Sequence, residues 1–173
     1  MPFYAVYDRI APAANKYMAT LFNTSSTRKV TVDRVYCLNW QVTAVVGVLL
    51  EQELRYVTAR TIGSAVTIQR EDTTETLSSG IEADVGSTTV TEGTGDRGLI
   101  RRIIASSEEI ALATAYGLNG VLANITDAQL KYYRHPGSLG LVLRQNQGVT
   151  VKNITSSTIG TVSYIFEFRD ELA

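Results

Sequence analysis

The chain has 173 residues, a single cysteine and a formal net charge of -1. A chain of this length can fold as one domain around its own core, and one cysteine excludes an internal disulfide. The near-neutral charge argues against nucleic acid as a partner, because phosphate binding requires clustered Lys and Arg. No apolar run approaches the ~20 residues of a membrane-spanning helix, so we expect no membrane contact.

Residues 1–22 combine aromatic side chains, among them Phe3, Tyr4 and Tyr7, with the small residues of APAA, and they show no clear period. Such a segment is either a mobile arm or an edge strand, and its aromatic residues favour docking on the domain or on a neighbour. We expect an N-terminal arm at 1–22 and a single domain at 23–173.

The segment STRKVTVDRVYCL, residues 26–38, predicts a strand. Strict alternation puts Val30, Val32, Tyr36 and Leu38 on one face. Arg34 falls on the same face, so it either lies near an end of the sheet or marks a β-bulge that re-aims the strand.

The segment QVTAVVGVLLEQELRYV, residues 41–57, would also suit a helical stripe. Its valines and its central Gly47 favour a strand with a glycine bulge instead. AVTIQRE, residues 65–71, predicts a further short strand.

The chain changes character over residues 71–96, which contain seven acidic residues, no basic one and many Thr, Ser and Gly. We expect a long loop here, of the kind that is often functional or mobile. STTVT, residues 87–91, could still pair in a hairpin. Calcium binding to the clustered carboxylates is a lesser alternative to their simple solvation.

RGLIRRIIAS, residues 97–106, predicts another strand. SSEEIALATAYG, residues 106–117, could begin with a capping box from Ser106 to Glu109 and form one short helix that ends at Gly117. TDAQLKYY, residues 126–133, carries a weaker capping signal of the same kind.

The last third has the clearest pattern. LGLVLRQNQGVTVKN, residues 139–153, is followed by a run in which Val162, Tyr164, Phe166 and Phe168 alternate with other residues. This alternation is typical of a half-buried antiparallel strand.

Two distant segments resemble each other. NTSSTRKVTV, residues 23–32, and NITSSTIGTVSYIFEF, residues 153–168, both begin with Asn and a Ser/Thr cluster and continue into an alternating run. Strands from the two ends of a sandwich can lie side by side, and chance use of a common turn chemistry is the alternative. Several short strands with at most one or two short helices predict an all-β antiparallel sandwich or barrel.

Catalytic residues are scarce. The only histidine, His135, directly precedes Pro136, which favours an extended or turn conformation. Cys37 lies in an apolar strand, where a buried thiol is expected rather than a nucleophile. The chain has no Cys/His cluster for zinc, and adjacent carboxylates on a strand point to opposite faces. We therefore expect no enzymatic activity, no metal and no cofactor.

The ordered series of segments resembles a group of small structural proteins of tailed bacteriophage heads. The similarity covers roughly residues 28–168 and comprises RKVTVDRVYCLNWQVTAVVGVLL, VTARTIGSAVTI, GLIRRIIASSEE and LVLRQNQGVTVKNITSSTIGTVSYIFEF. The matching features of the ending are Leu-Val-Leu-Arg at 141–144, a glycine-containing turn with an apolar run at 148–151, a Ser/Thr-rich turn at 156–160 and an aromatic-rich strand at 162–168.

This resemblance implies a jelly-roll-like β-sandwich that acts as a capsid decoration (cement) protein on the exterior of the virion. Such proteins are made in the cytoplasm of the bacterial host and bind the major capsid protein, usually as homotrimers at threefold positions of the expanded shell. By this resemblance we expect the chain to stabilise the mature head.

For the contact with a partner we expect the aromatic residues Phe3, Tyr4 and Tyr7 of the arm and the loop at 71–96. The basic cluster of Arg97, Arg101 and Arg102 is either solvated or paired with acidic groups of a neighbouring subunit.

Two other functions fit the composition. A neck, tail or fibre component of the virion would share the fold. A carbohydrate-binding sandwich would stack sugars on an exposed aromatic ring, for which the only tryptophan, Trp40, is the candidate if it does not belong to the core.

Overall fold

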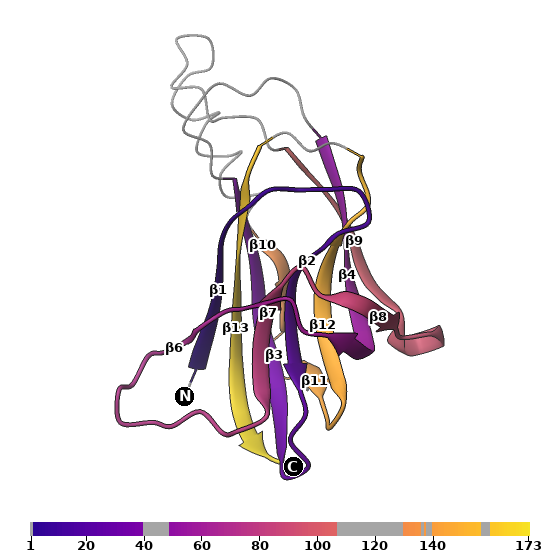
Figure 1. The fold of residues 1–173 in the computed structure, drawn as a ribbon. Coiled ribbons are helices and arrows are strands. Elements are labelled where there is room, and N and C mark those ends of the chain that lie inside the picture. Colours follow the sequence, from indigo (N-terminus) through magenta and orange to yellow (C-terminus); the bar gives the residue numbers. More distant parts are fainter. Residues whose placement is uncertain (1, 40–48, 107–129, 136, 138–139, 157–159) are drawn as a thin grey trace.

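The computed structural model describes residues 2–39, 49–106, 130–135, 137, 140–156 and 160–173. These residues form two antiparallel sheets that pack against each other (Figure 1), so the prediction of an all-β antiparallel sandwich is confirmed. In this part of the chain the helical structure is limited to the 3-10 turn η1 (Gly95–Arg97), and no helix is long and apolar enough to cross a membrane.

The strands divide between the two sheets. Sheet A contains β1 (Pro2–Ile10), β3 (Arg28–Asn39), β6 (Ile68–Arg70), β10 (Leu130–Tyr133), β11 (Leu141–Leu143) and β13 (Val162–Leu172). Sheet B contains β2 (Tyr17–Asn23), β4 (Leu49–Thr61), β5 (Ser64–Ala65), β7 (Ile81–Val85), β8 (Thr88–Glu92), β9 (Leu99–Ser106) and β12 (Gln147–Asn153).

The pairing of the strands is nested. In sheet A the first strand, β1, pairs with the last strand, β13, which pairs in turn with β3. In sheet B β2 pairs with β12, which pairs with β4. Strands that are far apart in sequence therefore lie at the centre of both sheets, and their inward side chains form one continuous core.

Some predicted features lie outside the described residues. These are the glycine bulge at Gly47, Trp40 and the short helix at 106–117, apart from Ser106, which ends β9. The weaker capping signal at 126–133 does not start a helix in its described half, because residues 130–133 form strand β10.

The structure corrects the prediction of an N-terminal arm. Residues 2–10 form β1, which pairs with β13 on one side and with β6 on the other, and residues 17–23 form β2. The buried rings of Phe3 and Tyr7 contact core aromatic rings, with centroids 5.8 Å from Phe168 and 5.0 Å from Phe166. The alternation of Phe3, Ala5 and Tyr7 was obscured by the irregular segment that follows them.

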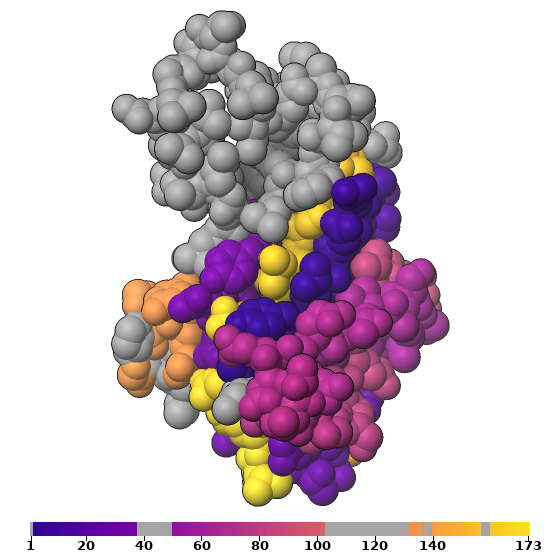
Figure 2. All heavy atoms as spheres, turned by 90° about the vertical axis from the view of Figure 1, so that its left-hand side faces the viewer, coloured from indigo at the N-terminus to yellow at the C-terminus, as the bar shows by residue number. Residues whose placement is uncertain are grey.

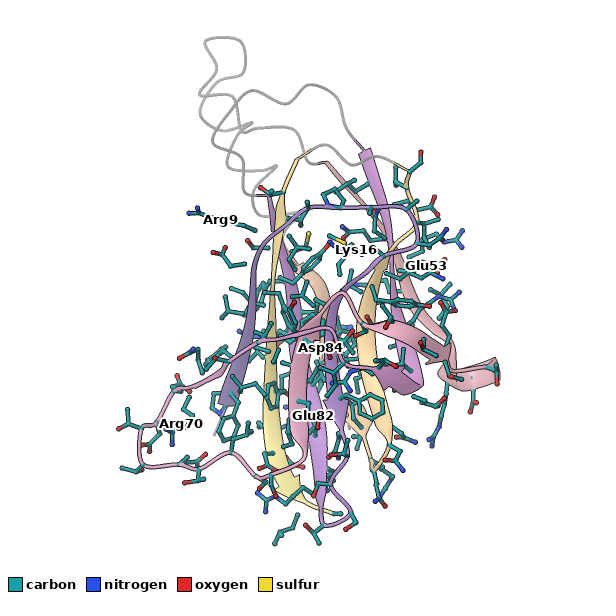
Figure 3. The ribbon with its side chains drawn as sticks, in the orientation of Figure 1. Arg9, Lys16, Glu53, Arg70, Glu82 and Asp84 are labelled. Carbon is teal, nitrogen blue, oxygen red and sulfur yellow. The ribbon has the colours of Figure 1, made fainter. Side chains whose placement is uncertain are left out.

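The acidic segment at 71–96 is also more structured than predicted. It contains β7 and β8, and β8 pairs with β4 rather than with β7. Asp84 of β7, labelled in Figure 3, is buried. It receives a hydrogen bond from Arg60 Nε at 2.7 Å. Arg60 lies outside the segment, so the segment looked uniformly acidic although its buried carboxylate has a cationic partner.

We call the connections that follow Asn23 and Asn153 arches, because each leads from a strand of sheet B to a strand of sheet A. Asn23 ends β2 and Asn153 ends β12, and both side chains are buried. Within its own arch, Asn23 Nδ2 donates a hydrogen bond to the carbonyl of Arg28, and Asn153 Nδ2 donates one to the carbonyl of Thr155, both at 2.9 Å.

The same amides also tie each arch to the other half of the fold. Asn23 Nδ2 donates to the carbonyl of Leu143 at the end of β11, and Asn153 Nδ2 donates to the carbonyl of Ala13 after β1. The strands that flank the two arches pair with each other, β2 with β12 and β3 with β13. The interpretation that the echo brings strands from both ends side by side is confirmed.

We predict that Asn23→Ala lowers the free energy of unfolding by about 2–3 kcal/mol. The substitution leaves the carbonyls of Arg28 and Leu143 without this donor, and an unsatisfied buried polar group costs about 1–3 kcal/mol. Urea denaturation measures the change. Ser26→Ala, in the exposed part of the same arch, serves as the control and should stay within about 0.5 kcal/mol of the wild type. An equally small effect of Asn23→Ala would contradict the role of this amide.

Candidate interaction surface

A β-bulge interrupts strand β3 in the middle of sheet A. Arg34 lies opposite Glu167 and Val32 lies opposite Phe168, so Asp33 is the extra residue. A bulge of this kind bends the strand and re-aims its side chains. Here both Asp33 and Arg34 form their polar contacts with residues of the same outer face of sheet A.

The bulge also changes which residues of β3 face the core. Val32 is buried before the bulge, and Val35 and Cys37 are buried after it, whereas Tyr36 is half-buried. The predicted strict alternation from Val32 to Tyr36 is therefore wrong, and the alternative of a bulge at Arg34 is confirmed. Cys37 is a buried thiol, as expected.

The carboxylate of Asp33 holds two arginines together. One oxygen lies 2.6 Å from Arg134 Nε, and the other accepts a hydrogen bond from Arg169 Nε at 2.7 Å. The side chain of Asp33 is 14% exposed, so water competes only partly for these contacts. Asp33 therefore fixes two guanidinium groups from β13 and from the end of β10 beside each other.

Arg34 connects the aromatic residues of the same face. Its Nη1 donates a hydrogen bond to the hydroxyl of Tyr36 at 3.1 Å and lies 3.5 Å from a carboxylate oxygen of Glu167. Its guanidinium carbon lies 5.3 Å from the ring centroid of Tyr133, within the range of a cation–π interaction. The ring centroids of Tyr133 and of the exposed His135 lie 6.4 Å apart in a T-shaped arrangement.

A polar hollow of about 330 Å³ lies in the outer surface of sheet A and is lined by Pro2, Asp33, Arg34, Tyr133, Arg134, Glu167 and Arg169. Figure 2 shows this side of the molecule, with orange β10, purple β3, yellow β13, indigo β1 and magenta β6 beside one another. We call the following residues the sheet A face: Tyr4, Asp33, Arg34, Tyr36, Tyr133, Arg134, Glu167 and Arg169.

Of the predicted aromatic contact residues, only Tyr4 belongs to the sheet A face. It is half-buried, and burial, with a further contribution from nearby Glu167, raises the pKa of its hydroxyl. Phe3 and Tyr7 lie in the core, so their assignment to a contact surface is corrected. They point inward because they alternate with Tyr4 along β1.

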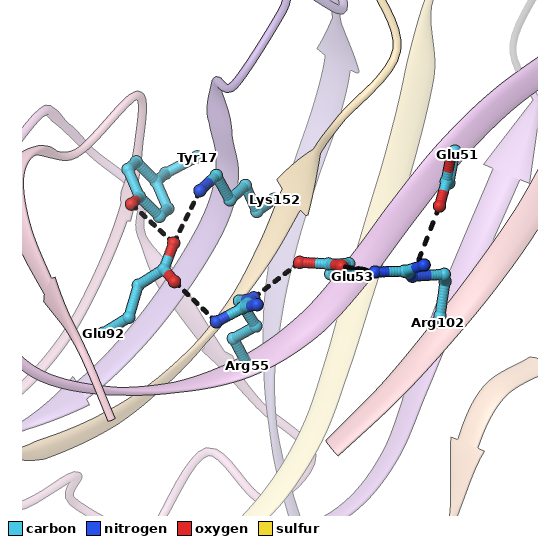
Figure 4. A network of polar contacts seen from close by, with 7 residues as sticks. All are labelled: Tyr17, Glu51, Glu53, Arg55, Glu92, Arg102 and Lys152. Carbon is cyan, nitrogen blue, oxygen red and sulfur yellow. Dashed lines mark hydrogen bonds and ion pairs between the residues drawn. The ribbon is translucent and has the colours of Figure 1, made fainter. Parts of the chain in front are cut away.

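The three predicted basic contact residues lie on the other sheet. Arg97, in η1, and Arg101, in β9, are both exposed. Arg102 pairs within its own chain, with Nη2 2.6 Å from Glu53 and Nε 3.2 Å from Glu51. Arg102 therefore belongs to a network on the outer side of sheet B (Figure 4), in which its acidic partners, Glu51 and Glu53, come from β4.

Glu53 is the buried centre of this network. Burial alone would raise its pKa, but hydrogen bonds from Arg55 and Arg102 outweigh that effect and hold the pKa below its usual value. Glu92 continues the network by accepting hydrogen bonds from Tyr17, at 2.9 Å, and from Lys152, at 2.6 Å. The pKa of Glu92 is lowered in the same way, because these donors outweigh the effect of burial.

The chemical groups of the described side chains limit what they could bind. In the part of the chain that the structure describes, no group of three or more His, Cys, Asp and Glu side chains could hold a metal ion. The sheet A face instead combines aromatic rings with guanidinium and carboxylate groups, which bind partners through stacking, hydrogen bonds and charge.

No family model matches the chain, and neither a curated protein nor a solved structure matches it.

Sequence reasoning missed the centre of this surface. Asp33, Arg134 and Arg169 come from distant parts of the chain, and each one alone reads as an ordinary solvated charge. The break in the alternation at Arg34 was the one usable signal, because a bulge re-aims side chains. The pairing partners of the bulge could not be read from the sequence.

We predict that Glu92→Gln reduces stability at pH 7 and that this effect shrinks as the pH falls below about 4. The folded pKa of Glu92 lies below its unfolded value of about 4.3, so the stability that its charge contributes is present above that pH and is lost as the pH falls through the folded pKa. Urea midpoints measured from pH 7 to pH 3 test this expectation. Glu71→Gln, at an exposed glutamate, is the control. A difference between Glu92→Gln and the wild type that does not change with pH would contradict the prediction.

Proposed function

We propose that this chain is a structural protein of a tailed bacteriophage virion, and specifically a decoration protein on the exterior of the mature head. The nested strand order supports the proposal. β1 pairs with β13, β2 pairs with β12, and the chain crosses between the two sheets several times, a nested order of the kind that a jelly roll would have. Jelly rolls recur among viral capsid and lectin domains, and the sequence resemblance favours the former.

The observation that carries the proposal is the composition of the sheet A face. It brings together three tyrosines, Tyr4, Tyr36 and Tyr133, and three arginines, Arg34, Arg134 and Arg169. Tyr133 and the three arginines line the hollow. Tyr and Arg are enriched at protein interfaces and dominate their hot spots. We infer that this face meets the major capsid protein, with copies of the same chain as the second kind of partner.

A decoration role also agrees with the charge and rigidity of the chain. A net charge of -1 lets many copies lie close together without strong mutual repulsion. A ligand that binds only the mature shell stabilises it by mass action at every occupied site. Ion pairs and hydrogen bonds connect neighbouring strands on the outer faces of both sheets. Such contacts favour the stiffness that a clamp between shell subunits requires.

The copy number of the protein in purified particles tests the proposal. We expect a ratio to the major shell protein near one to one, or a simple fraction of it, in quantitative mass spectrometry. A handful of copies per particle would reassign the protein to the neck, tail or fibre. Its complete absence from particles would overturn a structural role in the virion.

A further inference from the structure

The hollow in the sheet A face has a surplus of positive charge. Three arginines and two carboxylates line it, together with Pro2 and Tyr133: Arg34, Arg134, Arg169, Asp33 and Glu167. The charges of these five side chains sum to +1, in a chain whose net charge is -1. The hollow therefore complements a negatively charged group.

Arg34 is the arginine best placed to receive such a group. Its side chain is 42% exposed, and the contacts described above with Tyr36 and Glu167 both use Nη1. Its planar guanidinium carries further N–H groups on Nε and Nη2, which match the two oxygens of a carboxylate. The neighbouring ring of Tyr133 is 42% exposed and offers an apolar surface beside that charge.

Asp33 strengthens this arrangement. It pairs with Arg134 and Arg169, which both line the hollow, and Arg169 Nη1 also lies 3.0 Å from Glu171, so both guanidinium groups are held in place. A preorganised set of donors binds an incoming acceptor with less loss of side-chain entropy than mobile surface arginines would.

We infer that the hollow is a socket for a glutamate or aspartate side chain on an acidic segment of the shell protein, with the Tyr133 ring packing against the same segment. The inference rests on the proposed function, because the shell supplies the segment. Arg34 receives the carboxylate, and Arg134 and Arg169, which pair with Asp33 and Glu171, form the rest of the wall with guanidinium groups.

Two binding measurements with the full chain test the socket. The first is the number of added copies of the protein that bind to particles prepared without it. The second is an NMR titration of the isotope-labelled chain with hexaglutamate, with hexaglutamine as the uncharged control. Arg34→Gln should weaken binding in both assays by at least about tenfold, the lower end of the effect of losing a charge-assisted hydrogen bond. Arg34→Lys keeps the charge but loses the planar guanidinium that can bind both carboxylate oxygens. Its affinity should therefore lie between those of the wild type and of Arg34→Gln.

Arg101→Gln, at an exposed arginine of sheet B, is the matched control and should bind like the wild type. Thermal unfolding of each variant separates loss of binding from loss of folding, and Tyr133→Ala provides a second substitution at an exposed site. Binding of Arg34→Gln and Tyr133→Ala at wild-type strength would overturn the socket.

The outcomes for the socket and for the proposed function are distinguishable. If the wild type does not bind particles but binds hexaglutamate through Arg34, the virion role fails and a carboxylate socket stands without its shell partner. If the wild type binds particles and Arg34→Gln binds equally well, the virion role stands and the socket fails. Tighter binding of a hexameric oligouronate than of hexaglutamate would assign the hollow to an acidic saccharide and overturn the protein segment as its occupant.

Discussion

Where a chain passes from one sheet of a sandwich to the other, its backbone N–H and C=O groups need hydrogen-bond partners other than those of a paired strand. Two buried asparagine side chains meet this requirement here. Asn23 and Asn153 each bind a carbonyl of their own arch and a carbonyl from the opposite half of the fold. The positions of β3 and β13, and therefore the layout of the outer face of sheet A, depend on these two crossings.

The sheet A face shows how a local irregularity in a regular sheet produces a specific surface. Without the bulge, Asp33 and Arg34 would point to opposite sides of the sheet. With it, Asp33 gathers two arginines while Arg34 reaches two tyrosines and a glutamate. On the opposite sheet, Glu53 and Glu92 use similar charge pairs to connect neighbouring strands, with their carboxylates directed at partners within the chain.

The regular parts of the fold could be read from the sequence and the surface could not. The alternation of Val162, Tyr164, Phe166 and Phe168 identifies β13 because one face of that strand is buried throughout. The same logic failed for the segment at 71–96, because the buried charge of Asp84 is matched by Arg60, which lies outside that segment. Pairings between residues that are distant in sequence, such as that of Asp33 with Arg169, leave no trace in a local pattern.

The nested strand order has a consequence for how the protein forms. The central positions of both sheets are filled by β12 and β13, which are the last strands in the chain. While the polypeptide leaves the ribosome, β1 and β3 have no strand between them, and neither have β2 and β4. The contact order is therefore high, and the sandwich cannot form before β12 and β13 have been synthesised. Until then the inward faces of the earlier strands remain exposed to other chains, which favours aggregation over folding whenever synthesis stalls.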